Sequence, residues 1–304
     1  MRGPLVLGLA LVATAPAVAQ DTFPYRRTTA NGNGRMCLVW PAPEYVYHLD
    51  AAGSARTPGD TEVAAIEASF ESWRRVAATC SDYTFRRGRD WEGKVEVGYV
   101  KEDPASNYNI ITFRETYCFD VAPEDDECWA EMTCANKYAC WDEDSRTLAI
   151  TISSHGVESG RVWDADIEVN AAGYLFTTVD APPCVEGAES VDCVAMDLQN
   201  TMTHEIGHVV GLDHVPYPGA TMERTAPLGE TQKRIIDAGS AEGFCSIYPK
   251  GLPPNQCIMK NTGLALLGDG RGTGCSSAPG AVVAGGWLAA LALLRGRRRR
   301  TAGD

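Results

Sequence analysis

The chain has 304 residues, of which 44% are hydrophobic and 22% charged, a balance typical of a globular protein with a sizeable core. Its formal net charge of −13 argues against nucleic acid or an anionic membrane surface as a partner. Acidity of this degree instead fits solubility, calcium binding or a preference for basic substrates.

The first residues have the pattern of a secretory signal peptide. Arg2 precedes an apolar run, and the small residues Ala-Val-Ala stand directly before Gln20. This order predicts export with removal of residues 1–19. We therefore expect the mature protein at the cell surface, on the outer membrane or in the extracellular medium.

The cysteine content agrees with export. Without Cys275, which lies in a C-terminal motif treated below, the 11 cysteines become ten, enough for five disulfides in an oxidising compartment. Cys184 and Cys193 are expected to close a small loop, and Cys37 could pair with Cys80. A tight cluster is formed by Cys118, Cys128, Cys134 and Cys140. Disulfides are the favoured interpretation of this cluster, and a zinc site is the less favoured alternative because the cluster contains no CxxC pair.

The first half of the chain shows one helix and several strands. Residues 45–49 alternate as a strand does, and residues 61–78 carry apolar side chains at intervals of three and four. The second pattern predicts an amphipathic helix that begins after Asp60, a good capping residue. Further strands are predicted at residues 83–86 and 94–100.

The middle of the chain changes character. Residues 101–147 are acidic and rich in cysteine, which predicts an irregular insertion stapled by disulfides. Strands are predicted to follow at residues 148–153 and 162–170. The second of these has an apolar face and a polar face, and the polar face carries Asp164, Asp166, Glu168 and Asn170. A solvated face is the slightly favoured interpretation, and a Ca²⁺ site built from some of these oxygens is the alternative.

The stretch HEIGHVVGLDH carries the clearest chemistry. His204 and His208 are four residues apart in a predicted helix over 194–210, so both imidazoles share one face and can bind one zinc ion. Glu205 stands beside them and can deprotonate a zinc-bound water. Gly211 allows the helix to end sharply, which returns His214 as a third ligand. The other two histidines, His48 and His155, are expected in strands or at the surface.

The C-terminus is predicted to be a linker followed by a targeting segment. Residues 251–274 are rich in Gly and Pro, and residues 275–304 contain Cys275, an apolar run and an arginine cluster. The apolar run is short for a membrane span of ~20 residues, although a tail anchor with a cytoplasmic basic end is one interpretation. The segment resembles the MYXO-CTERM sorting signals of myxobacterial surface proteins. This resemblance implies removal near Cys275 by a sorting protease and attachment at the outer surface or membrane.

The histidine motif resembles that of the metzincin zinc peptidases, and Met222 follows it as a Met-turn methionine would. The spacing is similar to the matrixin branch, and the resemblance covers residues 37–249. It implies an α+β fold in residues 20–250, with a twisted mixed β-sheet, two long helices and a short C-terminal helix. It also implies one catalytic Zn²⁺ held by His204, His208 and His214, with Glu205 as general base. Met222 would then form an apolar floor under the metal.

The same resemblance implies how a protein or peptide substrate binds. Residues 223–235 would line the pocket for the side chain after the scissile bond, and residues 148–153 would pair with the extended substrate. Val215 departs from the serine that matrixins usually have there, and no Pro-Arg-Cys-Gly segment is present to cap the zinc. We therefore expect no separate inhibitory prodomain.

Two function classes remain open from the sequence. The first is an exported zinc-dependent endopeptidase. The alternative is a catalytically inactive surface binding or adhesion module that retains the metzincin fold. The presence of all three histidines and of Glu205 favours the enzyme, since inactive descendants most often lose one of them. A metal-dependent hydrolase of some non-peptide substrate has no specific support.

Overall fold

The computed structural model describes residues 24–30, 36–256 and 273–276. The predicted signal peptide, the arginine-rich tail and most of the predicted linker lie outside this part of the chain. Within it, a six-stranded sheet has the strand order β10-β5-β6-β4-β2-β3. Strands β2, β3, β4 and β6 run parallel to one another, whereas β5 runs antiparallel to both β6 and β10. The sheet is therefore mixed, as predicted.

The strands of this sheet are short, and the bounds of all six are β2 (Glu44–Leu49), β3 (Thr84–Arg87), β4 (Asn109–Phe113), β5 (Thr147–His155), β6 (Val162–Val169) and β10 (Thr273–Ser276). Two small two-stranded ladders lie beside the sheet, and they consist of β1 (Arg26–Arg27) with β9 (Leu212–Asp213), and β7 (Phe176–Thr177) with β8 (Met196–Asp197).

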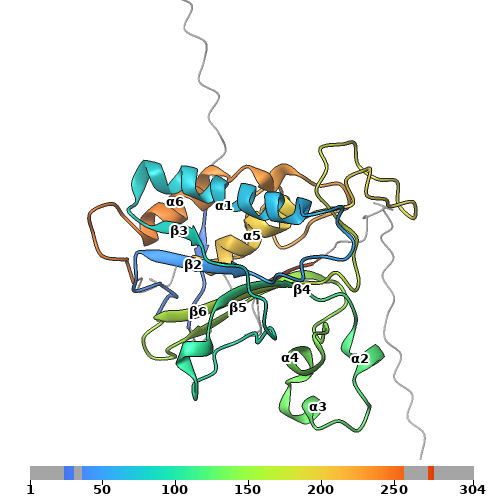
Figure 1. The fold of residues 1–304 in the computed structure, drawn as a ribbon. Coiled ribbons are helices and arrows are strands. Elements are labelled where there is room, and N and C mark those ends of the chain that lie inside the picture. Colours follow the sequence, from blue (N-terminus) through green and yellow to red (C-terminus); the bar gives the residue numbers. More distant parts are fainter. Residues whose placement is uncertain (1–23, 31–35, 257–272, 277–304) are drawn as a thin grey trace, which may run out of the picture.

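Three helices cover one face of the sheet (Figure 1). They are α1 (Thr61–Cys80), α5 (Leu198–Val209) and α6 (Ala238–Ile247), and the short 3₁₀ turns are η1 (Pro104–Ser106) and η2 (Gln232–Arg234). α1 presents Phe70 and Trp73, both fully buried, to the sheet and to α5. The Trp73 indole N–H donates to the Thr203 carbonyl at 2.9 Å, which satisfies its polar atom inside the core. These contacts hold α5 between α1 and the sheet.

The strand predicted at residues 94–100 is wrong, because β4 supplies the next sheet strand instead. The backbone N–H groups of Val97 and Gly98 donate to side chains rather than to a neighbouring strand, and Gly98 has φ +87°. β4 reads Asn-Ile-Ile-Thr-Phe and is buried on both faces between two parallel neighbours. A central parallel strand shows a continuous apolar run rather than alternation, which is why the alternating segment was misleading.

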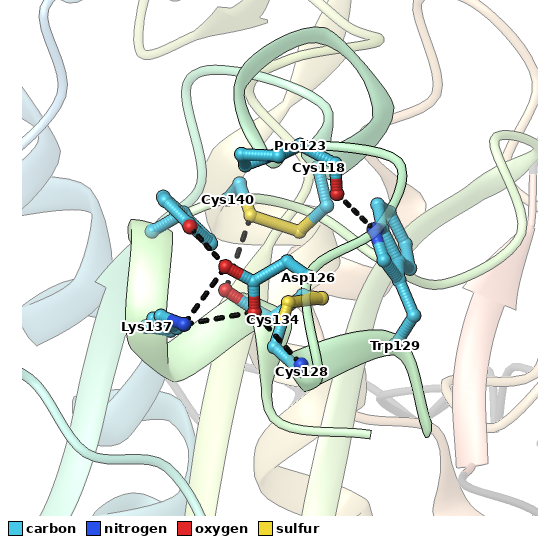
Figure 2. Close-up of a disulfide and its surroundings, with 9 residues drawn as sticks. Cys118, Pro123, Asp126, Cys128, Trp129, Cys134, Lys137 and Cys140 are labelled. Atoms are coloured by element: carbon cyan, nitrogen blue, oxygen red, sulfur yellow. Dashed lines mark hydrogen bonds and ion pairs between the residues drawn. A yellow bond between two sulfur atoms is a disulfide. The ribbon is translucent and has the colours of Figure 1, made fainter. Parts of the chain in front are cut away.

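The disulfide-stapled insertion is therefore shorter than residues 101–147, since it begins after β4. It contains three short helices on the opposite side of the sheet from α1, namely α2 (Cys118–Val121), α3 (Cys128–Glu131) and α4 (Cys134–Tyr138). Disulfides join Cys118 to Cys140 and Cys128 to Cys134 (Figure 2). Because these sulfur atoms are bonded in pairs, the alternative of a zinc site at this cluster is wrong.

Two other disulfides lie in the main domain, one closing a short loop and one joining distant segments. The expected bridge between Cys184 and Cys193 is confirmed. The expected pairing of Cys37 with Cys80 is wrong, because Cys80 is bonded to Cys245 and Cys37 is bonded elsewhere. The last turn of α1 lies beside α6, so the bridge joins two helices that are 165 residues apart in sequence.

Candidate metal centre

Helix α5 begins at a strong local signal. The Asp197 side chain caps it by accepting a hydrogen bond from the Asn200 N–H at 2.7 Å, and Arg234 Nε donates to the same carboxylate at 2.8 Å. Nearly every residue of α5 is buried, including its polar ones. This twelve-residue helix buries two histidines and a glutamate in the core. Buried polar groups cost free energy unless they have hydrogen-bond or metal partners, so these side chains require such partners.

The three predicted histidines converge on one point. The Nε2 atoms of His204 and His208 are 3.1 Å apart, and each lies 3.2 Å from Nε2 of His214. The outward Nδ1 atoms of His204 and His208 face the carbonyl oxygens of Thr221 and Leu212, at 2.7 and 2.8 Å. A carbonyl only accepts, so these two Nδ1 atoms carry the protons and the two Nε2 atoms present lone pairs to the centre.

Burial keeps the cluster neutral. It holds the pKa values of His204 and His214 well below the usual range for histidine, with further lowering from the neighbouring histidines. It lowers the pKa of His208 to about 4. Convergent neutral imidazole nitrogens suit a borderline-soft cation, and their spacing is compatible with Zn–N bonds of about 2.0–2.1 Å. The donor set therefore fits a zinc ion with a position left open.

Two glycines make this geometry possible. Gly211 has φ +92°, and a side chain there would approach the Leu38 carbonyl oxygen to 2.7 Å. The chain turns back at this residue and brings His214 to the end of α5, as the sequence predicted. Gly207 lies inside α5, where a Cβ would meet the sulfur of Met222 at 2.2 Å. The glycine thus makes room for the methionine under the cluster.

Met222 is 1% exposed and lies in a turn that is bound to the third histidine's loop. The Val215 N–H donates to the Met222 carbonyl at 2.9 Å, one residue after His214. Asp237, which caps α6, accepts the Thr221 N–H at 2.8 Å. The turn is therefore fixed from two sides, by the loop of His214 and by the last helix.

Glu205 has a partner that the sequence did not indicate. Thr151 Oγ1 on β5 donates to Glu205 Oε2 at 2.7 Å, and both residues are buried. The hydrogen bond links helix α5 to the sheet strand expected to bind substrate. Since 54 residues separate the two, no local sequence signal could have found this contact.

The third histidine is supported by a second missed contact. Its backbone N–H donates to Asp213 Oδ1 at 2.7 Å, and Asp213 Oδ2 lies 3.2 Å from an Arg26 guanidinium nitrogen. Arg26 belongs to β1, which pairs with β9 directly before His214. The segment that would follow the signal peptide thus braces the loop of His214.

The acidic row on β6 is not a solvated face, and that interpretation is wrong. All four side chains are buried, with residue exposures of 0–3%. Asp166 accepts backbone N–H groups from Ile110 and Gly98 at 2.8 and 2.6 Å, and Glu168 accepts the Nε–H of buried Arg114. β6 is covered on this side by the loops around β4 and by the insertion, which the alternating pattern could not reveal.

The remaining members of the row also have protein partners. Asn170 donates to the Thr147 carbonyl at 2.8 Å and accepts the Gly173 N–H at 2.9 Å. Asp164 shares a hydrogen bond with Asp166, and burial raises the pKa of Asp164 to about 6. Among the described residues, the three histidines form the one group of three or more potential ligands whose atoms gather within 4.8 Å. Calcium at the acidic row therefore stays a prediction.

The two other histidines lie in strands, as expected. His48 on β2 has its Nδ1 2.7 Å from the Arg89 carbonyl, and His155 at the end of β5 contacts the carbonyls of Ser153 and Ala30. Neither belongs to the cluster.

The insertion holds together through its own small core. Its four cysteines are buried with Ala122, and the Asp126 carboxylate accepts hydrogen bonds from Lys137 and the backbone of Cys128 (Figure 2). The lysine and Tyr138 hydrogen bonds hold the pKa of Asp126 below its usual range. Disulfides and this carboxylate replace the apolar core that so short a segment cannot supply.

Comparison with known families decides the relationship. The family model described as Matrixin (Peptidase_M10) matches residues 39–249, well over half of the chain. The chain belongs to the matrixin family. Its α+β fold is that of a matrixin, and the family is one of zinc-dependent metallopeptidases. A comparison with curated proteins found no match to this matrixin. No helix within its described residues is long and apolar enough to cross a membrane.

Proposed function

We propose that this matrixin is an exported zinc-dependent endopeptidase that hydrolyses peptide bonds in proteins. The observation that carries the proposal is the convergence of three neutral imidazole nitrogens, two of them from the helix that also carries Glu205. His204, His208 and His214 would hold the ion. When bound, Zn²⁺ would polarise the substrate carbonyl and lower the pKa of a water toward ~7.

The protein's own groups supply the proton transfers. Glu205 follows His204 directly in α5 and is fully buried. It would accept a proton from the attacking water and pass it to the leaving amine. The Thr151 hydrogen bond to Oε2 fixes the direction of this carboxylate. A carboxylate oriented in advance loses less entropy on reaching the transition state.

The sheet supports the proposed mode of substrate binding. β5 lies beside α5 and carries Thr151, so an extended peptide added along its outer edge would pass close to Glu205. The segment 223–235 would line the pocket for the following side chain. Its Lys233 is fully buried, and Lys233 Nζ lies 3.0 Å from a Glu230 carboxylate oxygen, which gives that wall a fixed shape.

Export, attachment at the outer surface through the C-terminus and processing by a sorting protease complete the proposal. Four disulfides among the described residues support an oxidising compartment, in which such bonds persist. Bound Ca²⁺ at the acidic row of β6 is a further, separate proposal.

Metal analysis and cleavage assays test the proposal together. We expect the purified protein to bind one zinc ion per chain and to cleave casein in a chelator-sensitive way. Glu205→Gln should keep the zinc and lose activity by a factor of about 10²–10⁴, the usual contribution of a general base. Undiminished cleavage by this variant would refute the role of Glu205. Zinc binding without any cleavage would favour the inactive binding module.

A further inference from the structure

The outer edge of β5 is already occupied by this chain's own C-terminal strand. β10 pairs with β5 in an antiparallel ladder, with Thr273 opposite Thr151, Gly274 opposite Ile150 and Cys275 opposite Ala149. β6 pairs with the other side of β5. Both hydrogen-bonding edges of β5 are therefore in use.

The position of β10 coincides with the proposed substrate path. Thr273 lies opposite Thr151, the residue whose hydroxyl binds the Glu205 carboxylate. Neighbouring strands lie about 4.8 Å apart, so β10 passes one strand spacing from the residue that contacts the general base. Cα atoms of β10 also come within 8 Å of Cα atoms of α5, the helix that carries the zinc ligands.

A strand and a substrate cannot use this edge together. An extended peptide that adds to a sheet binds through main-chain N–H and C=O groups, and each of these groups on β5 serves one neighbour at a time. Because β10 belongs to the same chain, its pairing is intramolecular, with an effective concentration that can reach about millimolar. Peptide substrates at lower concentrations compete poorly with such a segment.

We propose that Thr273–Ser276 is an intramolecular competitor of substrate at the β5 edge, which holds the peptidase latent until the segment is displaced or removed. The proposal rests on the peptidase function proposed above. It names the occupant of the edge as the C-terminal segment of this chain.

The ladder has the features of a removable cover. β10 has only four residues, one of them is a glycine, and its register with β5 shifts between Cys275 and Ser276. Glycine weakens a strand and a register irregularity interrupts its hydrogen bonds. A partner that binds this segment, or a protease that cuts it, would therefore release the edge at small energetic cost.

Two double variants of the full exported chain test the proposal. In the first, Thr273→Pro and Gly274→Pro remove two adjacent backbone N–H groups, so at least one ladder donor is lost whichever of the two points toward β5. In the second, Thr273→Ala and Gly274→Ala keep both N–H groups and serve as the matched control. Hydrogen–deuterium exchange of the peptide that covers residues 147–153 reports the pairing without any reference to activity.

We expect the proline pair to lose exchange protection at residues 147–153 and the alanine pair to keep it. Casein cleavage by the proline pair should exceed that of wild type by about tenfold, as for a competitor held at about ten times its dissociation constant. Equal protection in wild type and the proline pair would overturn the proposal, as would lost protection with unchanged cleavage. Protection that depends on protein concentration would assign the edge to a second copy and also overturn it.

Failure of the proposed function gives a different pattern. If wild type and both variants bind zinc but none cleaves, while the proline pair alone loses protection, then the peptidase assignment fails and latency fails with it. The strand pairing would still stand, as the cover of a binding edge.

Discussion

The histidine cluster and the acidic row of β6 are both groups of buried polar side chains, yet they differ in where their partners lie. In the cluster, His204 and His208 use their outer nitrogen atoms on backbone carbonyls and leave the inner ones facing each other. In the row, the Asp166 carboxylate accepts hydrogen bonds from two backbone N–H groups, and the Glu168 carboxylate accepts one from a guanidinium.

The difference shows what a metal site requires beyond ligand-type residues. The Nε2 lone pairs of His204 and His208 face each other with Nε2 of His214 beside them, an arrangement that a bound cation would stabilise. Most oxygens of the acidic row already have donors, so that row is a structural element that joins β4, β6 and the insertion.

The largest effect is expected at the cluster. His208→Ala should abolish zinc binding and reduce casein cleavage below detection, because two ligands hold the ion too weakly. Asp166→Asn is the matched change in the row and should leave one zinc per chain. Metal analysis of both purified variants checks this. Zinc retained by the histidine variant would mean that the ligand set is wrong.

The acidic row should matter for stability instead. Arg114 and Glu168 form a fully buried ion pair, with side-chain exposures of 1% and 4%. Arg114→Met should destabilise the fold by about 3–5 kcal/mol, because it leaves an uncompensated buried carboxylate. The double variant Arg114→Met with Glu168→Gln removes the charge as well and should recover part of that loss. Urea unfolding measures both, and a single variant as stable as wild type would contradict the structural role.

The row should also give stability a distinct pH dependence. Burial raises the folded-state pKa of Asp164 to about 6, above the value near 4 of an unfolded chain. The folded protein then binds more protons than the unfolded one between about pH 4 and pH 6. The free energy of unfolding should therefore fall as pH rises through this window, by an amount on the order of 2 kcal/mol.

Asp164→Asn should reduce this slope without abolishing it, because burial also raises the pKa values of Asp166 and Glu168. Unfolding measured at several pH values compares the two proteins. The same measurement tests calcium, since a bound Ca²⁺ would favour the ionised carboxylates and lower their pKa values. Loss of the slope on addition of calcium to wild type would support a cation at the row. A slope unaffected by millimolar calcium would exclude it there.

The smallest effect is expected at Thr151. Thr151→Val removes the hydroxyl that orients Glu205, at a cost of about 1.5 kcal/mol for a hydrogen bond to a charged group, or roughly tenfold in kcat. KM and zinc content should change little, because the residue acts through the carboxylate. Thr151→Ser keeps the hydroxyl and should restore kcat. A change confined to KM would show that Thr151 contributes to substrate binding rather than to positioning.

The sequence was most informative where each residue has a local task. The three histidines and Gly211 were predicted from spacing within one helix and its following turn, Met222 from the resemblance to the metzincins, and the strands at β5 and β6 from their apolar patterns. The same reasoning missed β4, because a strand buried between two parallel neighbours shows no alternation.

Contacts between distant segments were also out of reach. Thr151 meets Glu205, Cys80 meets Cys245 and Thr273 lies opposite Thr151 only because of the tertiary fold. The acidic row was misread for a related reason, since alternation shows which residues share a face and says nothing of what covers it.

Stepwise addition of zinc to the metal-free protein, with bound metal and casein cleavage measured in the same sample, tests the central claim most directly. We expect cleavage to rise with bound zinc and to stop rising at one ion per chain, and Glu205→Gln to bind the same amount without cleaving. Cleavage that is independent of zinc, or a protein that binds none, would contradict that claim.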